Sequence, residues 1–393
     1  MTKPALELSQ FHLKNFKAVR DSKPVRFTPL TVFIGNNGVG KSSLIEGMEM
    51  VKLIREEGLD QAMQHWRGFE YIWNKAVPHT LKMRESKECF TNQMSFRFAG
   101  TTREGLGQNA VLRKFRALTE VTAGLREEVF FLGEELHQET PGRLRTVTRP
   151  ISGQIKDETK GQPPLYFTPS PNESIVSAET SIARWQFVRL DADAMGHETP
   201  LRRVGGYLPL ATNGSNIAEY LLDIRDRDPS IVDGIVETMQ NVLPYLVDVK
   251  PVVTSEIGRS VYLELAEQKF NLPSWLFSTG TLRVVALLAL FRHPDPPPLI
   301  VIEEIENGLD PRTINLIVEE IREVVRTGRS QIILTTHSPY LLDLVPLSSL
   351  IFVERIDGQP TFIRPEDDAS VQRWSQDFAP GRLYTMGRFQ KSQ

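Results

Sequence analysis

The sequence predicts an α/β fold in which a mostly parallel core sheet is joined by an antiparallel β layer and an inserted helical region. Three observations support this prediction. A glycine-rich run at residues 35–42 lies between an apolar strand and a helix, and strands alternate with helices from residue 260 to residue 335. Between residues 89 and 155, apolar and polar side chains alternate, which is typical of antiparallel strands with one buried face.

The N-terminal part of the chain predicts three short strands, a loop and a helix. Breaks at Asp21–Pro24 and Thr28–Pro29 separate the strands, which we expect at residues 6–15, 25–27 and 30–34. After the loop, the sequence from Ser43 to Glu57 has the apolar spacing of a helix.

The loop between this strand and this helix, GNNGVGKS, fits the template G-x-x-x-x-G-K-[ST]. Glycines let successive backbone N–H groups point at the β- and γ-phosphates of a nucleotide, where the helix N-terminus adds its partial positive charge. We expect Lys41 to reach the terminal phosphates and Ser42 to hold Mg²⁺. An ordinary glycine-rich turn is the alternative, and the strand-loop-helix context disfavours it. The predicted cradle consists of Gly35, Asn36, Asn37, Gly38, Val39, Gly40, Lys41, Ser42 and Ser43.

The middle of the chain is expected to hold the antiparallel layer and the helical region. Strands are predicted at residues 93–98, 129–132 and 145–151, and the segment 157–174, rich in Pro, Gly, Ser and Thr, is predicted to be an exposed loop. Apolar residues at helical spacing in residues 215–246 predict two helices separated near Asp228–Pro229.

The C-terminal part predicts alternating elements: a strand at 260–265, a helix at 282–291, a strand at 299–302, a helix at 311–326 and a strand at 331–335. This order is typical of a parallel sheet with helices on its faces. We therefore divide the chain into four parts, with the nucleotide-binding head formed by its two ends. They are the head at 1–55, a β-rich or irregular insertion at 56–200, a helical subdomain at 201–255, and the rest of the head at 256–393.

Composition restricts the class of protein. A chain of 393 residues is long enough for more than one domain, and its 40% apolar and 24% charged fractions are those of a globular protein. Cys89 is the only cysteine, so no internal disulfide can form, which agrees with a reducing cytosol. Charged residues interrupt the first twenty residues, and the apolar stretch 284–291 is too short to span a bilayer. We expect a cytoplasmic protein without a membrane segment.

The charge balance gives no general attraction to nucleic acid, because the formal net charge is −3. Any DNA contact would have to come from a local basic patch. A solvated face is the alternative interpretation of the candidate residues, which are Arg143, Arg145, Arg149, Arg202 and Arg203.

Two carboxylates follow a buried strand in the C-terminal part. The strand is Leu299–Ile302, and Glu303 and Glu304 come directly after it. Parallel strands deliver such residues to the carboxyl edge of the sheet, where the phosphate loop is also expected. We expect Glu303 to hold the Mg²⁺ shell and Glu304 to orient and deprotonate the attacking water. The alternative is that both carboxylates merely end a strand in solvent.

Further residues of the same edge come next. Asn307–Pro311 predicts a turn in which Asp310 caps the following helix and Pro311 takes its first position. The apolar strand QIILTT then ends at His337, where an imidazole can contact the γ-phosphate and respond to its loss. A lone histidine is more often an ordinary surface or core residue, so this assignment depends on its position.

In order and spacing, Glu303–Glu304, Asn307–Asp310 and Thr336–Ser338 resemble the Walker B motif, D-loop and switch histidine of ABC-type ATPases, and Phe277–Arg283 resembles the ABC signature loop. Within that superfamily the chain is similar to compact bacterial ATPases of the SMC-like, RecF-like and OLD-like group that lack a TOPRIM domain. The stretches that carry this similarity are 13–17, 280–287, 302–309 and 374–387.

The resemblance implies ATP as nucleotide, Mg²⁺ as metal and a two-fold homodimer or higher homo-oligomer with ATP sandwiched between copies. It implies that the signature of one copy, with Ser278, Gly280 and Thr281, completes the site on its partner. Lys17 matches a position that contacts phosphate or base within one chain, and Asp310 matches the D-loop aspartate near the nucleotide.

The chain departs from the family pattern at three places. Glu303 stands where the first Walker B carboxylate is usually aspartate, and Thr279 occupies the second signature position, commonly Gly or Asp. The Q-loop glutamine has no secure counterpart, and Gln64 and Gln93 are the candidates.

Three biological roles remain open from the sequence. The resemblance favours a sensor or scaffold in bacterial genome or anti-phage defence that controls a separate effector, which we expect to be nuclease-like because too few residues follow His337 for a TOPRIM domain. A DNA repair or chromosome-maintenance ATPase is the second role, and it predicts ATP-dependent DNA binding. The energy subunit of a membrane transporter is the third and is disfavoured by the long middle insertion. Partner contacts are expected within residues 56–200.

Overall fold

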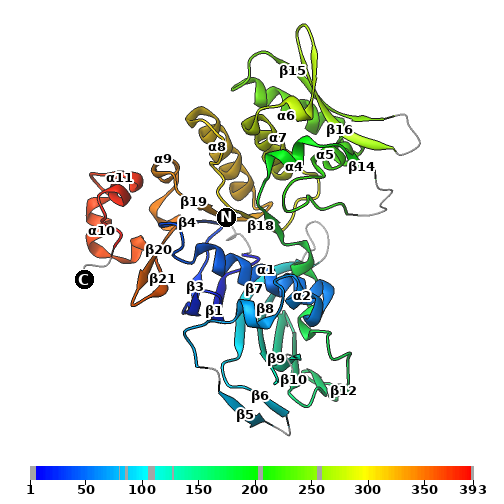
Figure 1. Cartoon of the computed structure of the whole chain (residues 1–393), viewed down its shortest axis with the longest axis vertical. Coiled ribbons are helices and arrows are strands. Elements are labelled where there is room, and N and C mark those ends of the chain that lie inside the picture. The colour runs from blue at the N-terminus through cyan, green and yellow to red at the C-terminus, as the bar shows by residue number, and fades with distance from the viewer. Residues whose placement is uncertain are drawn as a thin grey trace. The chain divides into compact units, whose positions relative to one another are not determined.

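The computed structural model describes residues 6–78, 80–84, 87–104, 111–125, 128–201, 207–254 and 259–390. It divides the chain into two units. Unit 1 comprises Met1–Trp185 with Ile351–Asp367, and unit 2 comprises Gln186–Leu350 with Asp368–Gln393. Each unit therefore combines segments that are distant in the sequence, as Figure 1 shows by colour.

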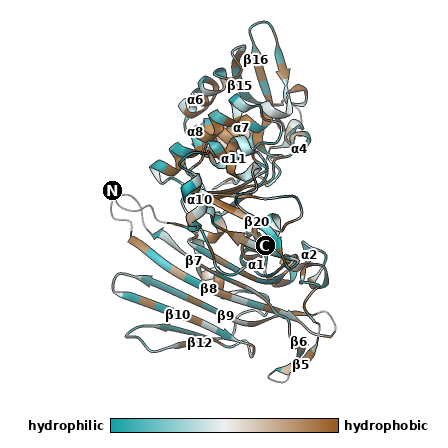
Figure 2. Ribbon diagram, turned by 90° about the vertical axis from the view of Figure 1, so that its left-hand side faces the viewer, coloured by the Kyte–Doolittle hydropathy of each residue, from teal (hydrophilic) through white to brown (hydrophobic). Residues whose placement is uncertain are grey.

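Alternating side chains build a nine-stranded sheet in unit 1, with the order β12-β11-β10-β9-β8-β7-β1-β2 and β3 paired to β1. The pairings are antiparallel, which confirms the predicted layer. Figure 2 shows its long strands side by side. The strands are β1 (Gln10–Phe16), β2 (Val19–Asp21), β3 (Val25–Arg26), β7 (Met94–Glu104), β8 (Val111–Ala123), β9 (Val129–Thr140), β10 (Arg143–Pro150), β11 (Ile155–Thr159) and β12 (Leu165–Phe167).

The segment 157–174 differs from its prediction as a loop. It contains the end of β11 and the whole of β12, which pairs antiparallel with β11 through Asp157 and Leu165. Prolines and glycines on both sides of β12 gave the segment a loop-like composition, and the backbone pairing of three residues outweighs that tendency. Elsewhere in unit 1, β5 (Leu81–Arg84) and β6 (Lys87–Phe90) form a separate hairpin, and β6 contacts β8.

Aromatic side chains fill the inner face of the nine-stranded sheet. Phe98 packs edge-on against Phe115 and Trp185, each with ring centroids 6.1 Å apart. The outer face is mostly polar, because the strands alternate buried and exposed residues. One sheet thus covers the core of unit 1 with one side and presents the other to solvent.

Helix α1 (Lys41–Glu57) packs on β1 and β7 in unit 1. Gly47 permits this close approach, because a Cβ there would lie 2.7 Å from the Leu13 side chain. Two short helices follow, α2 (Leu59–Gln64) and α3 (Phe69–Ile72). The strand β4 (Leu30–Ile34) that enters the glycine-rich loop neighbours β20 (Leu350–Ile356), which pairs antiparallel with β21 (Gln359–Ile363).

A parallel sheet forms the centre of unit 2, as predicted. Here β13 (Gln186–Val188) pairs parallel with β18 (Leu299–Ile302), which pairs parallel with β19 (Gln331–Thr336). Two helices connect these strands in sequence, α7 (Thr279–Arg292) and α8 (Pro311–Thr327), and α7 is buried along nearly all its length. The short helices α9 (Pro339–Asp343), α10 (Ala369–Trp374) and α11 (Pro380–Thr385) complete the C-terminal part.

The expected pair of helices in residues 215–246 is confirmed. Helix α5 (Ile217–Arg227) ends and α6 (Pro229–Gln240) begins at Asp228, whose carboxylate accepts a hydrogen bond from the backbone N–H of Ser230. A small sheet accompanies the pair, built from β14 (Thr199–Pro200), β15 (Leu246–Val253), β16 (Ser260–Glu267) and β17 (Asn271–Pro273). Helix α4 (Ala192–Gly196) follows β13. Among the described residues, no helix combines the length and apolarity needed to cross a membrane.

Candidate functional site

The glycine-rich loop has the backbone conformation that its template requires. Gly38 and Gly40 have φ values of 72° and 111°, in the left-handed region that side chains rarely adopt. Lys41 is buried, and its Nζ donates hydrogen bonds to the carbonyls of Gly35 (2.7 Å) and Asn36 (2.9 Å). The ammonium thus ties the start of the loop to the first turn of α1.

Strands from the far end of the chain press on this loop within unit 1. A Cβ on Gly35 would lie 2.2 Å from the carbonyl oxygen of Val353, and a Cβ on Gly40 would lie 2.6 Å from the ring of Pro360. These two glycines are therefore required by packing as well as by backbone conformation. Asn36, Asn37 and Gly38 lie exposed at the tip, as does Ser42.

The other predicted residues of unit 1 lie in defined contacts. The ammonium of Lys17 lies 2.8 Å from a carboxylate oxygen of Glu46 on α1 and 5.4 Å from the ring centre of Trp66. Its phosphate or base contact stays a prediction. Gln64 is exposed at the end of α2, and the Gln93 carbonyl accepts a hydrogen bond from Asn15.

In unit 2, the carboxyl ends of neighbouring parallel strands bring charged side chains together. Val188 pairs with Ile302 and Ile302 with Leu334, so the residues that follow emerge at one edge. The Glu303 backbone N–H donates to the Val188 carbonyl, 3.0 Å away, and Arg189 donates from Nε to the Glu303 carboxylate. The sequence reasoning missed Arg189, although it follows the apolar run Gln186–Val188 as Glu303 follows its own strand.

Three hydrogen bonds fix Glu304, the predicted base. It has a φ of 50°, unusual for a residue with a side chain. Its N–H donates to Thr335 Oγ1 (2.9 Å), and its carbonyl accepts from Arg283 Nη2 (2.9 Å). Its exposed carboxylate accepts from Asn307 Nδ2 at 2.5 Å. The backbone is fixed by buried groups while the side chain remains accessible.

Arg283 is a second residue that the sequence reasoning missed in this role. It projects from α7, is 7% exposed, and donates to the carbonyls of Leu190 (2.7 Å) and Glu304. Burial lowers the pKa of its guanidinium, against the opposing effect of nearby Glu304 and Glu306. A single arginine inside the otherwise apolar stretch of α7 was the available signal.

The signature-like residues form the N-terminus of α7. Ser278 caps the helix, since its Oγ accepts from the Thr281 backbone N–H at 3.1 Å. Gly280 lies directly on the D-loop, where a Cβ would be 2.6 Å from the Gly308 carbonyl oxygen. Ser278 and Thr279 are exposed. The signature and the D-loop of one chain therefore form one packed surface.

Asp310 and His337 complete the set of predicted site residues in unit 2. Asp310 caps α8 by accepting from the backbone N–H groups of Arg312 (2.9 Å) and Thr313 (3.2 Å), and the Thr313 hydroxyl is the main cause of its lowered pKa. The backbone N–H of His337 donates to the Glu306 carboxylate, and its side chain is half-buried. Nucleotide contacts by Asp310 and His337 stay predictions.

The donor set fits magnesium better than a softer metal. Among the described residues, no three His, Cys, Asp or Glu side chains gather to hold a metal ion. The predicted ligands are the Ser42 hydroxyl and the Glu303 carboxylate, both hard oxygen donors. Magnesium is commonly bound by one or two protein oxygens together with phosphates and water, so this set suits it.

The arginines considered for a DNA patch are mostly structural. Arg149 is 6% exposed and donates to the Pro171 carbonyl (3.0 Å) and the Glu134 carboxylate (3.3 Å). Arg145 forms an ion pair with Asp157 at 2.6 Å. Arg143 is exposed, and Arg202 and Arg203 lie outside the described residues.

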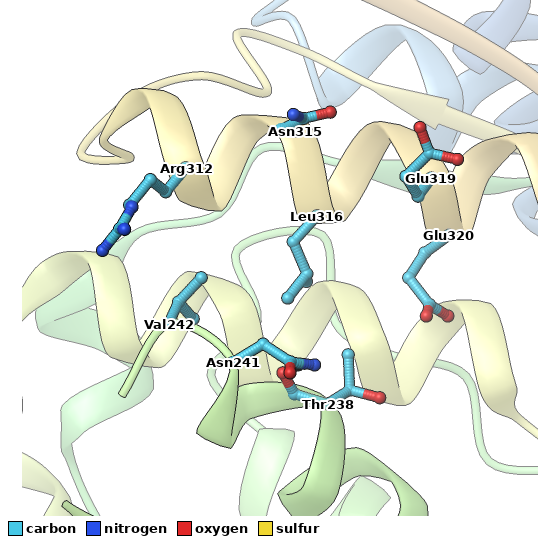
Figure 3. A pocket seen from close by; sticks show the side chains of 8 residues that line it. All are labelled: Thr238, Asn241, Val242, Arg312, Asn315, Leu316, Glu319 and Glu320. Atoms are coloured by element: carbon cyan, nitrogen blue, oxygen red, sulfur yellow. Dashed lines mark hydrogen bonds between the residues drawn. The ribbon is translucent and has the colours of Figure 1, made fainter. Parts of the chain in front are cut away.

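A groove of about 570 Å³ lies between α6 and α8 in unit 2. Figure 3 shows Leu316 and Glu320 pointing from α8 toward Thr238 and Asn241 at the end of α6. Arg292 of α7 links the two helices, because it donates to Thr238 Oγ1 at 2.7 Å and to the Glu320 carboxylate. The lining contains none of the residues predicted for nucleotide binding.

Two family models match the chain. Residues 7–67 match the "AAA ATPase domain", and residues 168–343 match "AAA domain, putative AbiEii toxin, Type IV TA system". The first contains the phosphate loop, and the second contains the signature, Walker B and switch histidine motifs. The comparison with curated proteins found no match.

Solved SMC head domains share the fold. An SMC head bound to the C-winged helix domain of ScpA is 16% identical with a TM-score of 0.54, over 91% of this chain and 97% of that one. A Pyrococcus furiosus SMC head with an extended coiled coil, bound to the C-terminal domain of ScpA, is 14% identical with a TM-score of 0.54, over 94% and 99%. A head from Pyrococcus yayanosii is 11% identical with a TM-score of 0.53, over 91% and 96%.

These findings agree with the motifs on both units. The family models cover each predicted nucleotide motif, and the structural matches extend over nearly the whole chain. The chain is an ATPase, and its fold is that of solved SMC head domains.

Proposed function

We propose that two copies of this chain bind two ATP molecules between them and that the ATP-bound dimer controls a separate effector protein in bacterial anti-phage defence. In each site, the phosphate loop of one copy faces the signature of the other. ATP binding assembles the dimer, and hydrolysis releases it. The protein acts in the cytoplasm.

Each predicted site residue has a separate role in ATP hydrolysis. Lys41 and the loop N–H groups bind the β- and γ-phosphates. Ser42 and Glu303 would hold Mg²⁺, which would neutralise developing charge. Glu304 takes the proton of the attacking water, and His337 contacts the γ-phosphate. Ser278, Gly280 and Thr281 of the second copy cap the γ-phosphate, with Asp310 near the shared site and Lys17 on the phosphate or base in its own copy.

The exposed position of the signature residues is the observation that supports a dimer. Ser278 and Thr279 are exposed at the N-terminus of α7, a helix of 14 residues, and Gly280 behind them is packed on Gly308. A helix N-terminus carries partial positive charge and favours an anion such as a phosphate. This support makes the exposed end a preformed surface for the nucleotide of a second copy.

The mass of the full chain in solution tests the dimer. Glu304→Gln preserves binding but blocks turnover, so with ATP and Mg²⁺ light scattering should give the dimer mass. Adding Ser278→Arg should return the monomer mass, because the larger cationic side chain obstructs the signature surface. Glu323→Gln, on the exposed face of α8, is the matched control and should not trap a dimer. A monomer in the Glu304→Gln variant at saturating ATP would contradict the proposal.

Two comparisons support an effector. The family model over residues 168–343 is described by a toxin of a toxin–antitoxin system, and two similar heads are bound to a domain of another protein, ScpA. Purification of the native complex through the Glu304→Gln chain should yield a stoichiometric protein partner with nuclease activity that appears only with ATP. Contacts in residues 56–200 should be needed for its retention. A complex without a second protein, in cells under phage challenge, would contradict the defence role.

A DNA-clamping ATPase is the second candidate, favoured by the outer face of the nine-stranded sheet. The side chains of Arg97, Lys114 and Arg116 line a groove of about 760 Å³, and none forms an ion pair with a described residue. Arg116 lies opposite Ala99 and Lys114 opposite Thr101, so these cations follow the seam of β7 and β8. Glu135 and Glu139 in the same groove oppose this attraction.

Salt dependence separates the two candidates. A clamp should bind duplex DNA more tightly with ATP, and its affinity should fall steeply with salt because phosphate contacts release counterions. Arg97→Ala with Arg116→Ala should weaken that binding and reduce the salt slope by about 2. Arg322→Ala with Arg326→Ala on α8 is the matched control. Salt-insensitive or absent DNA binding leaves the effector role as the function.

A further inference from the structure

The end of β13 places an arginine against the carboxylate predicted to bind magnesium. Arg189 and Glu303 follow the paired residues Val188 and Ile302, and Arg189 donates from Nε to the Glu303 carboxylate. The Arg189 backbone is fixed as well, because its N–H donates to the Thr212 carbonyl at 2.7 Å. Backbone register therefore holds these two side chains side by side.

Glu303 is the more buried member of this pair. Its side chain is 13% exposed, against 37% for Arg189. A carboxylate that is partly removed from water is stabilised by a neighbouring cation. The guanidinium supplies that charge from the more exposed side of the pair.

We propose that Arg189 is a positioning residue whose guanidinium and Mg²⁺ are alternative partners of the Glu303 carboxylate. The proposal rests on the proposed role of Glu303 as a magnesium ligand. Both cations require the same carboxylate oxygens, and together they repel each other. Without nucleotide, Arg189 holds the Glu303 carboxylate in position as its partner in an ion pair. With ATP bound, Glu303 would exchange the guanidinium for Mg²⁺ as its partner.

The same segment is tied to the signature helix. Leu190, which follows Arg189, offers its carbonyl to Arg283 Nη1 at 2.7 Å, and Arg283 Nη2 holds the Glu304 carbonyl at 2.9 Å. Asp191 then caps α4. Displacement of Arg189 therefore acts on a segment bonded to α7 and to the catalytic carboxylate. Occupancy of the metal site is in this way linked to the helix that carries the signature.

Direct metal binding tests the exchange without measuring activity. Mn²⁺ serves as the probe, followed by electron paramagnetic resonance with saturating ATP, on the full chain carrying Glu304→Gln. Removing the competing cation by Arg189→Met should tighten Mn²⁺ binding about three- to tenfold. Arg189→Lys keeps a cation, so its Mn²⁺ affinity should stay nearer to that of the parent chain. Arg326→Met, which removes an exposed cation of α8, is the matched control and should leave the affinity unchanged.

A parallel variant separates the two proposals. Glu303→Gln should weaken Mn²⁺ binding, and if it does not, the metal role of Glu303 fails. If Glu303→Gln weakens binding while Arg189→Met leaves it equal or weaker than in the parent, only the exchange proposed for Arg189 is overturned. Arg189→Gln, which retains a hydrogen-bond donor to Glu303, replaces the methionine variant if that one does not fold, and it should also tighten binding.

Discussion

The phosphate loop of unit 1 and the carboxylate edge of unit 2 are stabilised in different ways. The loop is fixed by the absence of side chains, since Gly35 and Gly40 leave no room for a Cβ beside Val353 and Pro360. The edge is fixed by hydrogen bonds from Arg189, Arg283 and other side chains to Glu303 and Glu304. The loop therefore depends on shape, and the edge depends on charges whose partners come from separate elements.

This difference predicts which region tolerates substitution. A loop held by packing loses its form with a single methyl group. An edge held by hydrogen bonds should keep its backbone structure when one side chain is replaced by a similar one. Such a replacement should instead impair a step of ATP hydrolysis. Four variants break or sharpen the comparison.

The largest effect is expected for Glu304→Gln. The amide keeps the size of the side chain and can still accept from Asn307, but it cannot take a proton from water. Turnover should fall about 10²- to 10⁴-fold, the usual contribution of a general base. ATP affinity should be preserved. Phosphate release and titration with a fluorescent ATP analogue measure both quantities, and Glu319→Gln on α8 is the control. Wild-type turnover would refute the role of Glu304.

Gly35→Ala should damage the loop, because both packing and backbone conformation favour glycine there. Its Cβ would lie 2.2 Å from the Val353 carbonyl oxygen, so backbone must move. Overpacking of this kind costs about 1–3 kcal/mol of folding free energy, and ATP binding should be lost with it. Gly133→Ala on β9 is the control, because its added Cβ would meet only the Arg149 carbonyl oxygen at 3.8 Å, an ordinary contact. Thermal unfolding and ATP titration give the result, and intact ATP binding in Gly35→Ala would show that the loop does not depend on shape.

Arg283→Met should separate catalysis from binding in unit 2. The apolar side chain fills similar space but leaves the Leu190 and Glu304 carbonyls without their donor. Each unsatisfied buried acceptor costs about 1–3 kcal/mol. Turnover should fall while ATP affinity, measured by titration, stays near wild type. Arg326→Met is the control for loss of charge. If turnover were unchanged despite lower stability, Arg283 would have only a structural role.

The smallest effect is a pH dependence in unit 1. Burial raises the pKa of Glu7, nearby Glu179 adds to this, and hydrogen bonds from Ser181 and Trp185 oppose it. The folded protein therefore holds this proton more tightly than the unfolded chain, and stability declines as pH rises from 4.5 through the raised value.

Glu7→Gln cannot ionise but can still accept from Trp185 Nε1. Its stability relative to wild type, from urea unfolding at several pH values, should increase as pH rises through this window. Glu88→Gln, an exposed carboxylate on β6, should show no such trend. Parallel curves for Glu7→Gln and wild type would mean that burial does not govern this group.

The sequence was sufficient where an element depends on consecutive residues. The loop, Glu303–Glu304 and the helices on either side of Asp228 are local patterns, and the structure places them as predicted. Arg189 was missed because its importance comes from a strand 114 residues away. The contact of Pro360 with Gly40 also joins distant segments. Such supports follow from strand order, which a single sequence does not determine.

The contact of β20 and β21 with the phosphate loop has a consequence for synthesis of the chain. Residues 35–42 leave the ribosome long before Val353 and Pro360 do. A nascent chain therefore carries the complete nucleotide motif before it carries the strands that shape it. The loop can reach its finished form only after Pro360 has been synthesised.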